Sequence, residues 1–342
     1  NVRCNNAIGL LLMRKGQFAA AEAYFRTAVA TLTERNPNPY DGEPIYNLGL
    51  ALKYQGRYNE AYDRFYKSCW NAAWQDAGYF ACAQISTMQS RLEDALDEID
   101  RSLIRNWHNH KARALKTAIL RRMGRTEEAL QLIEDSLSID KFNFGCRYEK
   151  YLITNVVDEL SVMKEMMRGE PHNYDEIALD YCAAGCWQEA ASLWNIAIAE
   201  GIVTPMTYYY LGWCLHQGGL SGVKQAFADA VKACPDYCFP NRLEAILALQ
   251  CAMVQNPDDA RAPYYLGNLY YDKRQYDLAM EAWETSVRLD GSFPTVWRNL
   301  ALAFFNKKNE EAKAIECMER AFRLDTTDAR ILMELDQLYK RV

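Results

Sequence analysis

A period of about 34 residues runs along this chain and limits the folds open to it. In six of these periods, a small residue is followed twelve positions later by an alanine. Steps of 34 residues separate positions 49, 83 and 117, and they recur from 178 to 212 and from 267 to 301. Such self-similarity predicts a repeat architecture, in which each unit buries its apolar surface against its neighbours. The pairs are Gly9 and Ala21, Gly49 and Ala61, Ala83 and Ala95, Thr117 and Ala129, Ala178 and Ala190, and Gly267 and Ala279.

Each period reads as two helices joined by a turn. The turns contain segments such as "KGQF", "QGRY", "MGRT" and "AGCW", and an aromatic or aliphatic residue follows each alanine by four positions. A glycine inside a helix, such as Gly267, costs about 1 kcal/mol relative to alanine. We therefore expect the small residue of the first helix to let the alanine of the second helix approach closely, so that the contact offsets this cost.

Two segments show the pattern most fully, "YNLGLALKYQGRYNEAYDRFYKS" and "YYLGNLYYDKRQYDLAMEAWETS". Their order of leucine, glycine and tyrosine, followed by alanine, an aromatic residue and a second small residue, resembles the tetratricopeptide repeat family. The resemblance covers nearly the whole chain. It implies an all-α, right-handed α-solenoid of antiparallel helical hairpins. It also implies that the first helix of each hairpin lines a concave face that binds a protein or a peptide.

Departures from the period predict how one solenoid over residues 1–342 is organised. The step from 117 to 178 is 61 residues, which leaves a shortened segment after one full repeat. The step from 212 to 267 is 55 residues, and the extra residues include a further helical pattern. The expected segments are regular repeats over 1–143, a degenerate short hairpin over 144–170, repeats over 171–235, an irregular helix and turn over 236–258, repeats over 259–328, and a capping or truncated helix over 329–342.

Composition and charge argue against several classes of function. The net charge is −6, from 45 acidic and 39 basic residues, and no basic stripe indicates a nucleic-acid partner. No apolar run approaches the roughly 18 residues of a membrane span. The 11 cysteines are scattered singly, which favours reduced thiols in the cytoplasm. Neither "WHNHK" nor "CPDYC" has the partners of a metal site, so we expect no metal, no cofactor and no catalytic site.

Candidate binding residues follow from projecting the first helix of each hairpin. Positions −3, +1 and +4 from the small residue share one helix face, because they are spaced by four and three residues. In the first half of the chain this face includes Phe80, Gln84, Ala114 and Ala118, and after the degenerate hairpin it includes Asp175, Leu179 and Cys182. In the second half it is rich in aromatic side chains, which suit peptide or sugar recognition. The candidate binding residues are Tyr209, Trp213, His216, Tyr264, Asn268, Tyr271, Arg298 and Phe305.

Those aromatic residues are also expected where helices only pack or where another domain of the same polypeptide docks. The sequence therefore predicts a non-enzymatic scaffold that binds a peptide or a protein domain on its concave face, and a homo-oligomer is a further possibility. An alternative comes from the run "CFPNRLEAILALQCAMVQNPDDARAPYYLGNLYYDKRQYDLAMEAWETSVRLDGSFPTVWRNLALAFFNKK". It resembles the C-terminal repeat region of large bacterial proteins that carry an uncharacterised, mutarotase-like β-sandwich domain. This resemblance implies a non-catalytic accessory or oligomerisation region of a larger carbohydrate-active protein, and we expect the chain to be a piece of such a protein.

Overall fold

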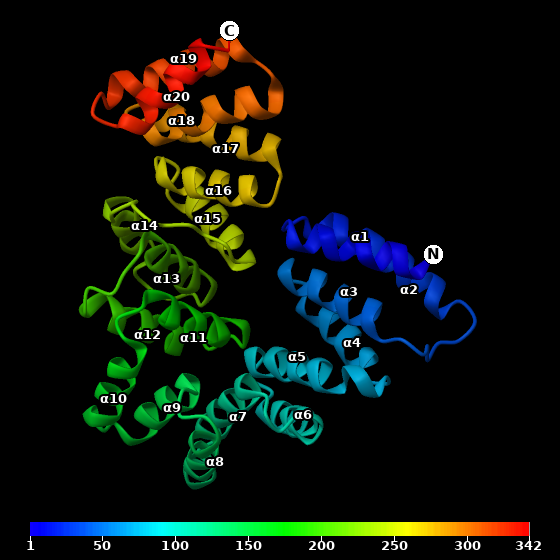
Figure 1. The fold of residues 1–342 in the computed structure, drawn as a ribbon. Helices are drawn as coiled ribbons and strands as arrows, with labels where there is room; N and C mark the ends of the chain where they lie inside the picture. The colour runs from blue at the N-terminus through cyan, green and yellow to red at the C-terminus, as the bar shows by residue number, and fades with distance from the viewer. Residues whose placement is uncertain (342) are drawn as a thin grey trace. The chain divides into compact units, whose positions relative to one another are not determined.

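The computed structural model describes residues 1–341, and these residues form helices and no β-strand. Consecutive helices pack against each other as hairpins (Figure 1). This arrangement confirms the predicted all-α solenoid of antiparallel helical hairpins. Contacts within the chain divide it into two compact units, Asn1–Ile202 and Val203–Val342. A single solenoid over residues 1–342, with the segment boundaries expected from the sequence, stays a prediction.

The first unit consists of hairpins joined end to end. The hairpin formed by α9 and α10 has only eleven residues in each helix, and it lies in the segment for which the sequence predicts a degenerate hairpin. The helices are α1 (Val2–Arg14), α2 (Phe18–Thr33), α3 (Glu43–Tyr54), α4 (Tyr58–Ser68), α5 (Gln75–Met88), α6 (Leu92–Arg105), α7 (His110–Arg122), α8 (Thr126–Ile139), α9 (Phe144–Thr154), α10 (Val157–Met167), α11 (Pro171–Ala183) and α12 (Trp187–Ala199), with a 3₁₀ turn, η1, at Ala72–Trp74.

The second unit interrupts its hairpins with one additional helix, α15, which packs against both α13 and α16. Helix α18 continues into a π-helical turn, η2, before the chain reverses. The elements are α13 (Pro205–Gln217), α14 (Val223–Lys232), α15 (Leu243–Gln255), α16 (Arg261–Asp272), α17 (Tyr276–Leu289), α18 (Pro294–Ala303), η2 (Phe304–Lys308), α19 (Glu311–Leu324) and α20 (Ala329–Tyr339).

The turn inside most hairpins reverses the chain at a residue with a left-handed backbone, seven positions after the small residue. Four of these residues are the glycines of the turn segments seen in the sequence. Glycine has no Cβ and adopts a positive φ without strain, which explains its recurrence there. Their φ values are 77° at Gly16, 73° at Gly56, 76° at Gly124 and 71° at Gly185.

Four glycines within helices, Gly9, Gly49, Gly212 and Gly267, make room for a ring of the second helix. A Cβ atom on Gly267 would lie 2.5 Å from Cδ1 and Nε1 of Trp283, and 3.0 Å from the carbonyl oxygen of Ala279. The close approach of Ala279 is as expected, and the ring four residues further on lies closer still. The same arrangement recurs in three other hairpins. A Cβ atom would lie 2.4 Å from the Phe25 ring if built on Gly9, 2.7 Å from the Phe65 ring if built on Gly49, and 2.5 Å from the Phe227 ring if built on Gly212.

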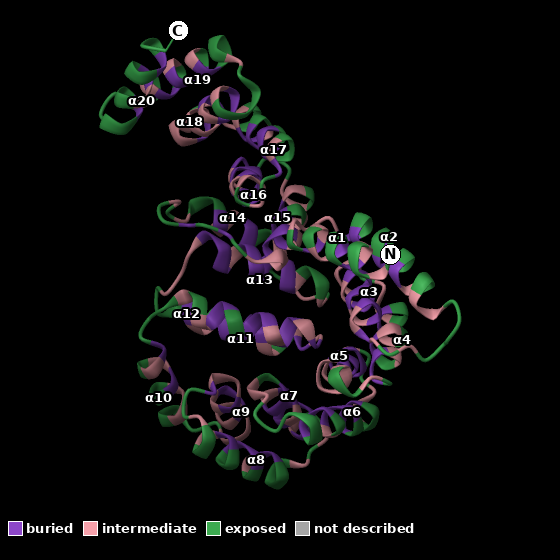
Figure 2. Cartoon of the chain, turned by 45° about the vertical axis from the view of Figure 1, so that its right-hand side comes forward, coloured by how far each residue is buried: buried purple, intermediate pink, exposed green. Residues whose placement is uncertain are grey.

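Buried residues follow the contacts between helices in each unit (Figure 2). The alanine of each repeat pair is 0% exposed, as expected for a position at which two helices meet. These alanines are Ala21, Ala61, Ala95, Ala129, Ala190 and Ala279.

A buried carboxylate connects the first two hairpins. Glu22 accepts hydrogen bonds from Arg26 Nε at 2.7 Å, Gln55 Nε2 at 2.9 Å, and Arg57 Nη1 at 2.7 and 2.8 Å. Burial alone would raise the pKa of Glu22. The hydrogen bonds outweigh burial and hold the pKa of this carboxyl below its usual value.

A second buried carboxylate connects the short hairpin to its neighbours. Glu149 on α9 is 0% exposed, and it accepts hydrogen bonds from Arg121 Nε at 2.6 Å and from the Tyr181 hydroxyl at 2.7 Å. Nη2 of Arg121 also lies 2.8 Å from Oε1 of Glu189 on α12. Burial raises the pKa of Glu149, and the guanidinium of Arg121 opposes that rise. The network therefore joins α7, α9, α11 and α12.

Candidate functional site

A groove of about 750 Å³ lies in the second unit between α16, α18 and the loop that precedes α15. Helix α16 contributes Tyr264, Asn268 and Tyr271, and α18 contributes Arg298. The loop adds two aromatic side chains, Tyr237 and Phe239, and further lining comes from Asp236, Asp272, Phe293, Asn299 and Arg330.

Helix α16 is fixed at its start by Asp259. Its Oδ1 accepts hydrogen bonds from the backbone N–H groups of Arg261 at 2.7 Å and Ala262 at 3.1 Å, as an N-terminal cap does. Its Oδ2 accepts a hydrogen bond from the Tyr209 hydroxyl at 2.9 Å. Burial raises the pKa of Asp259. With the helix start held in this way, the spacing of four and three residues directs Tyr264, Asn268 and Tyr271 to the same face.

Aromatic rings form much of the groove floor. The ring centroids of Tyr264 and Phe293 are 4.8 Å apart in an edge-to-face arrangement, and those of Tyr271 and Trp283 are 5.5 Å apart. Tyr264 is buried, whereas Tyr271 is half-buried. Burial raises the pKa of Tyr264, so its hydroxyl stays protonated at neutral pH. These rings therefore offer the groove stiff apolar area, together with the neutral phenol group of Tyr264.

The side chain of Asn268 connects the two helices of the groove. Its Oδ1 accepts hydrogen bonds from Trp283 Nε1 at 3.1 Å and from Asn299 Nδ2 at 3.1 Å. The same indole nitrogen lies 3.3 Å from the carbonyl oxygen of Tyr264. Two donors on one oxygen fix the orientation of the Asn268 amide, and this orientation depends on the ring that packs against Gly267.

Arg298 lines the groove as a member of an ion pair. Its Nε lies 2.6 Å from Oε2 of Glu334 on α20, and its Nη2 contacts Oε1 of the same carboxylate. Such a two-point pair fixes the plane of the guanidinium. The positive charge of Arg298 is therefore balanced within the protein.

The structure brings together four of the eight candidate residues, Tyr264, Asn268, Tyr271 and Arg298. The three candidates on α13 do not line the groove. Tyr209 is fully buried beside Asp259, Trp213 is also buried, and His216 is exposed near the end of its helix. Helix α15 packs against both α13 and α16, and the Tyr209 side chain is taken up by its contact with Asp259.

Phe305 also lies outside the groove. The sequence projection assumes a regular α-helix after Ala301, but residues 304–308 form the π-helical turn. This turn adds one residue, and the left-handed residue that ends it, Asn309, lies eight positions after Ala301 instead of seven. The ring of Phe305 instead lies 5.6 Å from the guanidinium of Arg341.

Tyr237 and Phe239 were missed by the projection because they lie in a loop. They are 93% and 73% exposed, although aromatic side chains of this size are usually covered. The signal in the sequence is the segment "CPDYCFP", in which two aromatic residues stand between prolines. In the structure Cys234 is exposed and Cys238 is buried.

The paired helices and recurring small residues define the chain as a helical-repeat protein. Comparison with protein families supports tetratricopeptide repeats specifically, because residues 2–30 match a model described as "Tetratricopeptide repeat" and residues 267–308 match one described as "TPR repeat". Such repeats support a protein-interaction scaffold. Neither match concerns a mutarotase-like β-sandwich, and the resemblance to proteins with that domain stays a prediction.

Among solved structures, the chain is similar to a tetratricopeptide repeat protein from Parabacteroides merdae, with 14% identity, 89% of this chain and 98% of that chain covered, and a TM-score of 0.39. It is also similar to YrrB, described as a TPR protein with an unusual peptide-binding site, with 15% identity, 70% and 97% coverage, and a TM-score of 0.27. TM-scores this low carry no information about function. Across residues 1–341, every helix is too short or too polar to cross a membrane.

Proposed function

We propose that this chain is a non-enzymatic interaction scaffold and that an extended peptide binds in the groove of its second unit. The observation that carries the proposal is the groove itself, which combines aromatic rings with an oriented asparagine amide. Its volume of about 750 Å³ falls within the range of about 300–1,000 Å³ that is usual for ligand pockets. Aromatic anchors surrounded by a few polar groups are the side chains that contribute most to peptide and protein binding.

The exposed loop aromatics support the same proposal. Tyr237 and Phe239 line the groove together with residues of α16. Their rings face solvent, and a bound peptide would cover this apolar area. The charges are mixed, because Asp236 and Asp272 are present together with Arg298 and Arg330, and Arg298 is already paired. We therefore expect a peptide with apolar or aromatic anchors and little net charge.

The proposal is tested by selecting peptides from a random displayed library on the full chain. The affinity of the selected peptides is then measured by calorimetry for the chain and for the double variant Tyr237→Ser/Phe239→Ser. Loss of two anchors is expected to weaken binding at least about tenfold. The matched control is Tyr40→Ser, which removes a tyrosine that is 80% exposed in the first unit and is expected to leave the affinity unchanged.

Equal affinities for the chain and the double variant, or the absence of any enriched peptide, would exclude this groove as a peptide site. A second copy of the chain, or another domain of the same polypeptide, is the further partner predicted from the sequence. Light scattering of the chain at increasing concentration tests the homo-oligomer, and a mass that stays that of one chain argues against it.

A further inference from the structure

The groove of the second unit contains two pairs of aromatic rings at two points along α16. Tyr264 pairs with Phe293, and Tyr271 pairs with Trp283. Tyr264 and Tyr271 are seven residues apart on one helix face, which places the two pairs about 10 Å apart along the helix axis. In each pair one ring, that of Phe293 or Tyr271, is half-buried and has area left for a ligand. The groove therefore offers two apolar contact points at a defined separation.

Further contacts hold the rings of the two pairs in place. The guanidinium carbon of Arg261 lies 3.9 Å from the centre of the Phe293 ring, and such stacking orients the ring. The centre of the Tyr271 ring also lies 5.0 Å from that of Tyr276, in an edge-to-face arrangement. Contact points that are ordered before binding lose little conformational freedom when a ligand arrives. A ligand whose own repeat matches their separation is therefore favoured.

Among peptide conformations, the polyproline II helix matches this separation. It rises about 3.1 Å per residue with three residues per turn, so that residues i and i+3 share one side and lie about 9 Å apart. In a β-strand, residues on one side are two or four positions apart, at about 7 or 13 Å. An α-helix matches at i and i+7, but its carbonyl groups are bonded within the helix. Only the polyproline II conformation combines this spacing with free carbonyl groups.

The polar groups beside the two pairs suit a ligand with free carbonyl groups. Both lone pairs of Asn268 Oδ1 accept hydrogen bonds, from Trp283 Nε1 and Asn299 Nδ2, so that its Nδ2 is the atom left for a ligand. The hydroxyl of Tyr264 stays protonated and can also donate. Proline residues fit such a groove, because they have a carbonyl group but no N–H that would need an acceptor.

The charges that line the groove are mostly balanced within the chain. Besides Arg298, whose ion pair is described above, Arg330 has Nη2 3.6 Å from Oδ2 of Asp328. Oδ2 of Asp272 lies 3.9 Å from Nζ of Lys273. A charged ligand would compete with these pairs, and an uncharged ligand would not. The charge of the groove is therefore complementary to a peptide segment without charged side chains.

We propose that the groove binds a proline-rich peptide in the polyproline II conformation, with prolines three residues apart at the two aromatic pairs. This proposal rests on the proposed peptide-binding function and names the class of peptide. Grooves lined by aromatic rings are a known way to bind such segments, which lose little entropy because the conformation exists before binding. The exposed rings of Tyr237 and Phe239 line the same groove and add apolar contact area.

The test is calorimetry on the full chain with three peptides of equal length. The first consists of alanine, leucine and proline, with a proline at every third position. The second has the same composition, with prolines alternately two and four positions apart. In the third, alanine replaces each proline. The first peptide is expected to bind, and the other two to bind at least about tenfold more weakly. Competition with a peptide selected from the displayed library shows whether both occupy the same groove.

The variant Tyr271→Leu removes one of the two aromatic contact points and keeps an apolar side chain. It is expected to lower the affinity for the first peptide at least about fivefold. It should also reduce the preference for the three-residue spacing to less than about threefold, because one contact point cannot distinguish spacings. Tyr40→Leu, at an 80% exposed tyrosine of the first unit, is the matched control and should change neither quantity. Circular dichroism checks that both variants fold.

The proposal is overturned if the first two peptides bind equally, or if Tyr271→Leu keeps both the affinity and the spacing preference. Should Tyr271→Leu not fold, the comparison of the three peptides on the unaltered chain decides. Library-selected peptides that bind and are weakened by Tyr237→Ser/Phe239→Ser, while the proline-rich peptide does not bind, overturn this inference and leave the proposed function standing. Absence of binding by every peptide overturns both.

Discussion

Replacing Gly267 with alanine tests how the groove depends on the packing beneath it. The new Cβ would lie 2.5 Å from two ring atoms of Trp283, and the ring is held by hydrogen bonds to Asn268 and to the carbonyl of Tyr264. Forcing a methyl group into a packed site costs about 1–3 kcal/mol. Losing the indole hydrogen bond costs about 1 kcal/mol, and the higher helix propensity of alanine returns about 1 kcal/mol. We expect a net destabilisation of about 1–3 kcal/mol.

Hydrogen exchange measured by mass spectrometry on the full chain reports this change locally. Since 1.4 kcal/mol corresponds to a factor of ten, amides of α16 and α17 are expected to exchange roughly 5- to 150-fold faster in Gly267→Ala. Peptides from the first unit are the internal control and should be unaffected. The same glycine substitution is then made in a Trp283→Leu background, which completes a double-mutant cycle.

In the leucine background the indole is absent, so the penalty of the added methyl group should fall to less than half. The carbonyl of Ala279 at 3.0 Å keeps part of it. An unchanged penalty in that background would refute the argument that the glycine makes room for the ring. So would an alanine variant that exchanges as slowly as the original chain.

Two further predictions concern the buried carboxylates. The pKa of Glu22 is lowered in the folded chain, so its contribution to stability is present above the usual carboxyl pKa and is lost as the pH falls through the lowered value. Glu22→Gln should therefore flatten the fall in melting temperature at acidic pH, and an equally steep fall would contradict this. Arg121→Met leaves Glu149 buried without its cation and should cost about 3–5 kcal/mol in urea denaturation. Adding Glu149→Met should restore most of that loss, and no recovery would show that the pair is not the cause.

The sequence predicted the hairpins because their determinants are local and repeated. A small residue, a left-handed turn residue seven positions later and a buried alanine twelve positions later all lie within one period. The same locality explains Tyr264, Asn268 and Tyr271, since helical geometry alone directs them to one face. The contacts of Arg121 with Glu149, and of Arg298 with Glu334, join residues 28 and 36 positions apart, and no period encodes them.

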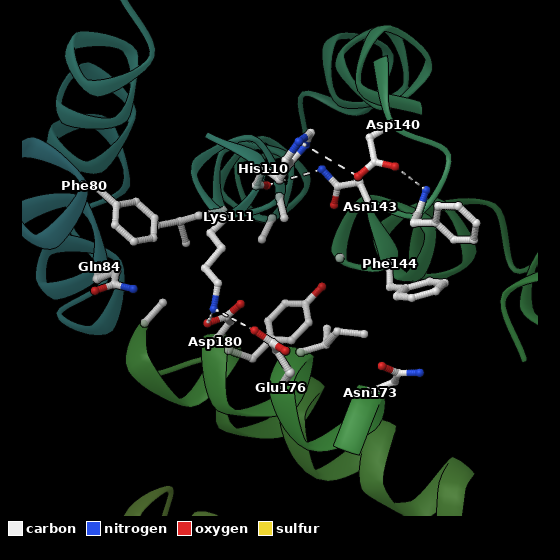
Figure 3. Close-up of a pocket in the computed structure, with 18 residues that line it drawn as sticks. Phe80, Gln84, His110, Lys111, Asp140, Asn143, Phe144, Asn173, Glu176 and Asp180 are labelled. Carbon is white, nitrogen blue, oxygen red and sulfur yellow. Dashed lines mark hydrogen bonds and ion pairs between the residues drawn. The ribbon is translucent and has the colours of Figure 1, made fainter. Parts of the chain in front are cut away.

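Next to the irregular segments, projection along a regular helix holds for α16 but fails for α11 and α13. On α11 the projected residues Asp175, Leu179 and Cys182 are buried, and Asp175 accepts a hydrogen bond from Trp194 Nε1 at 2.9 Å. The α11 side chains that line the pocket between α5, α7 and α11 (Figure 3) include those of Glu176 and Asp180, next to the projected positions. Projection assumes that every hairpin stacks on the previous one in the same way, and α11 follows a hairpin whose helices have eleven residues each. In the second unit, the added helix α15 interrupts the regular succession of hairpins. The loop that carries Tyr237 and Phe239 supplies groove-lining side chains that projection along a helix does not include. Irregular segments in a repeat chain are therefore the places to search first for its binding sites.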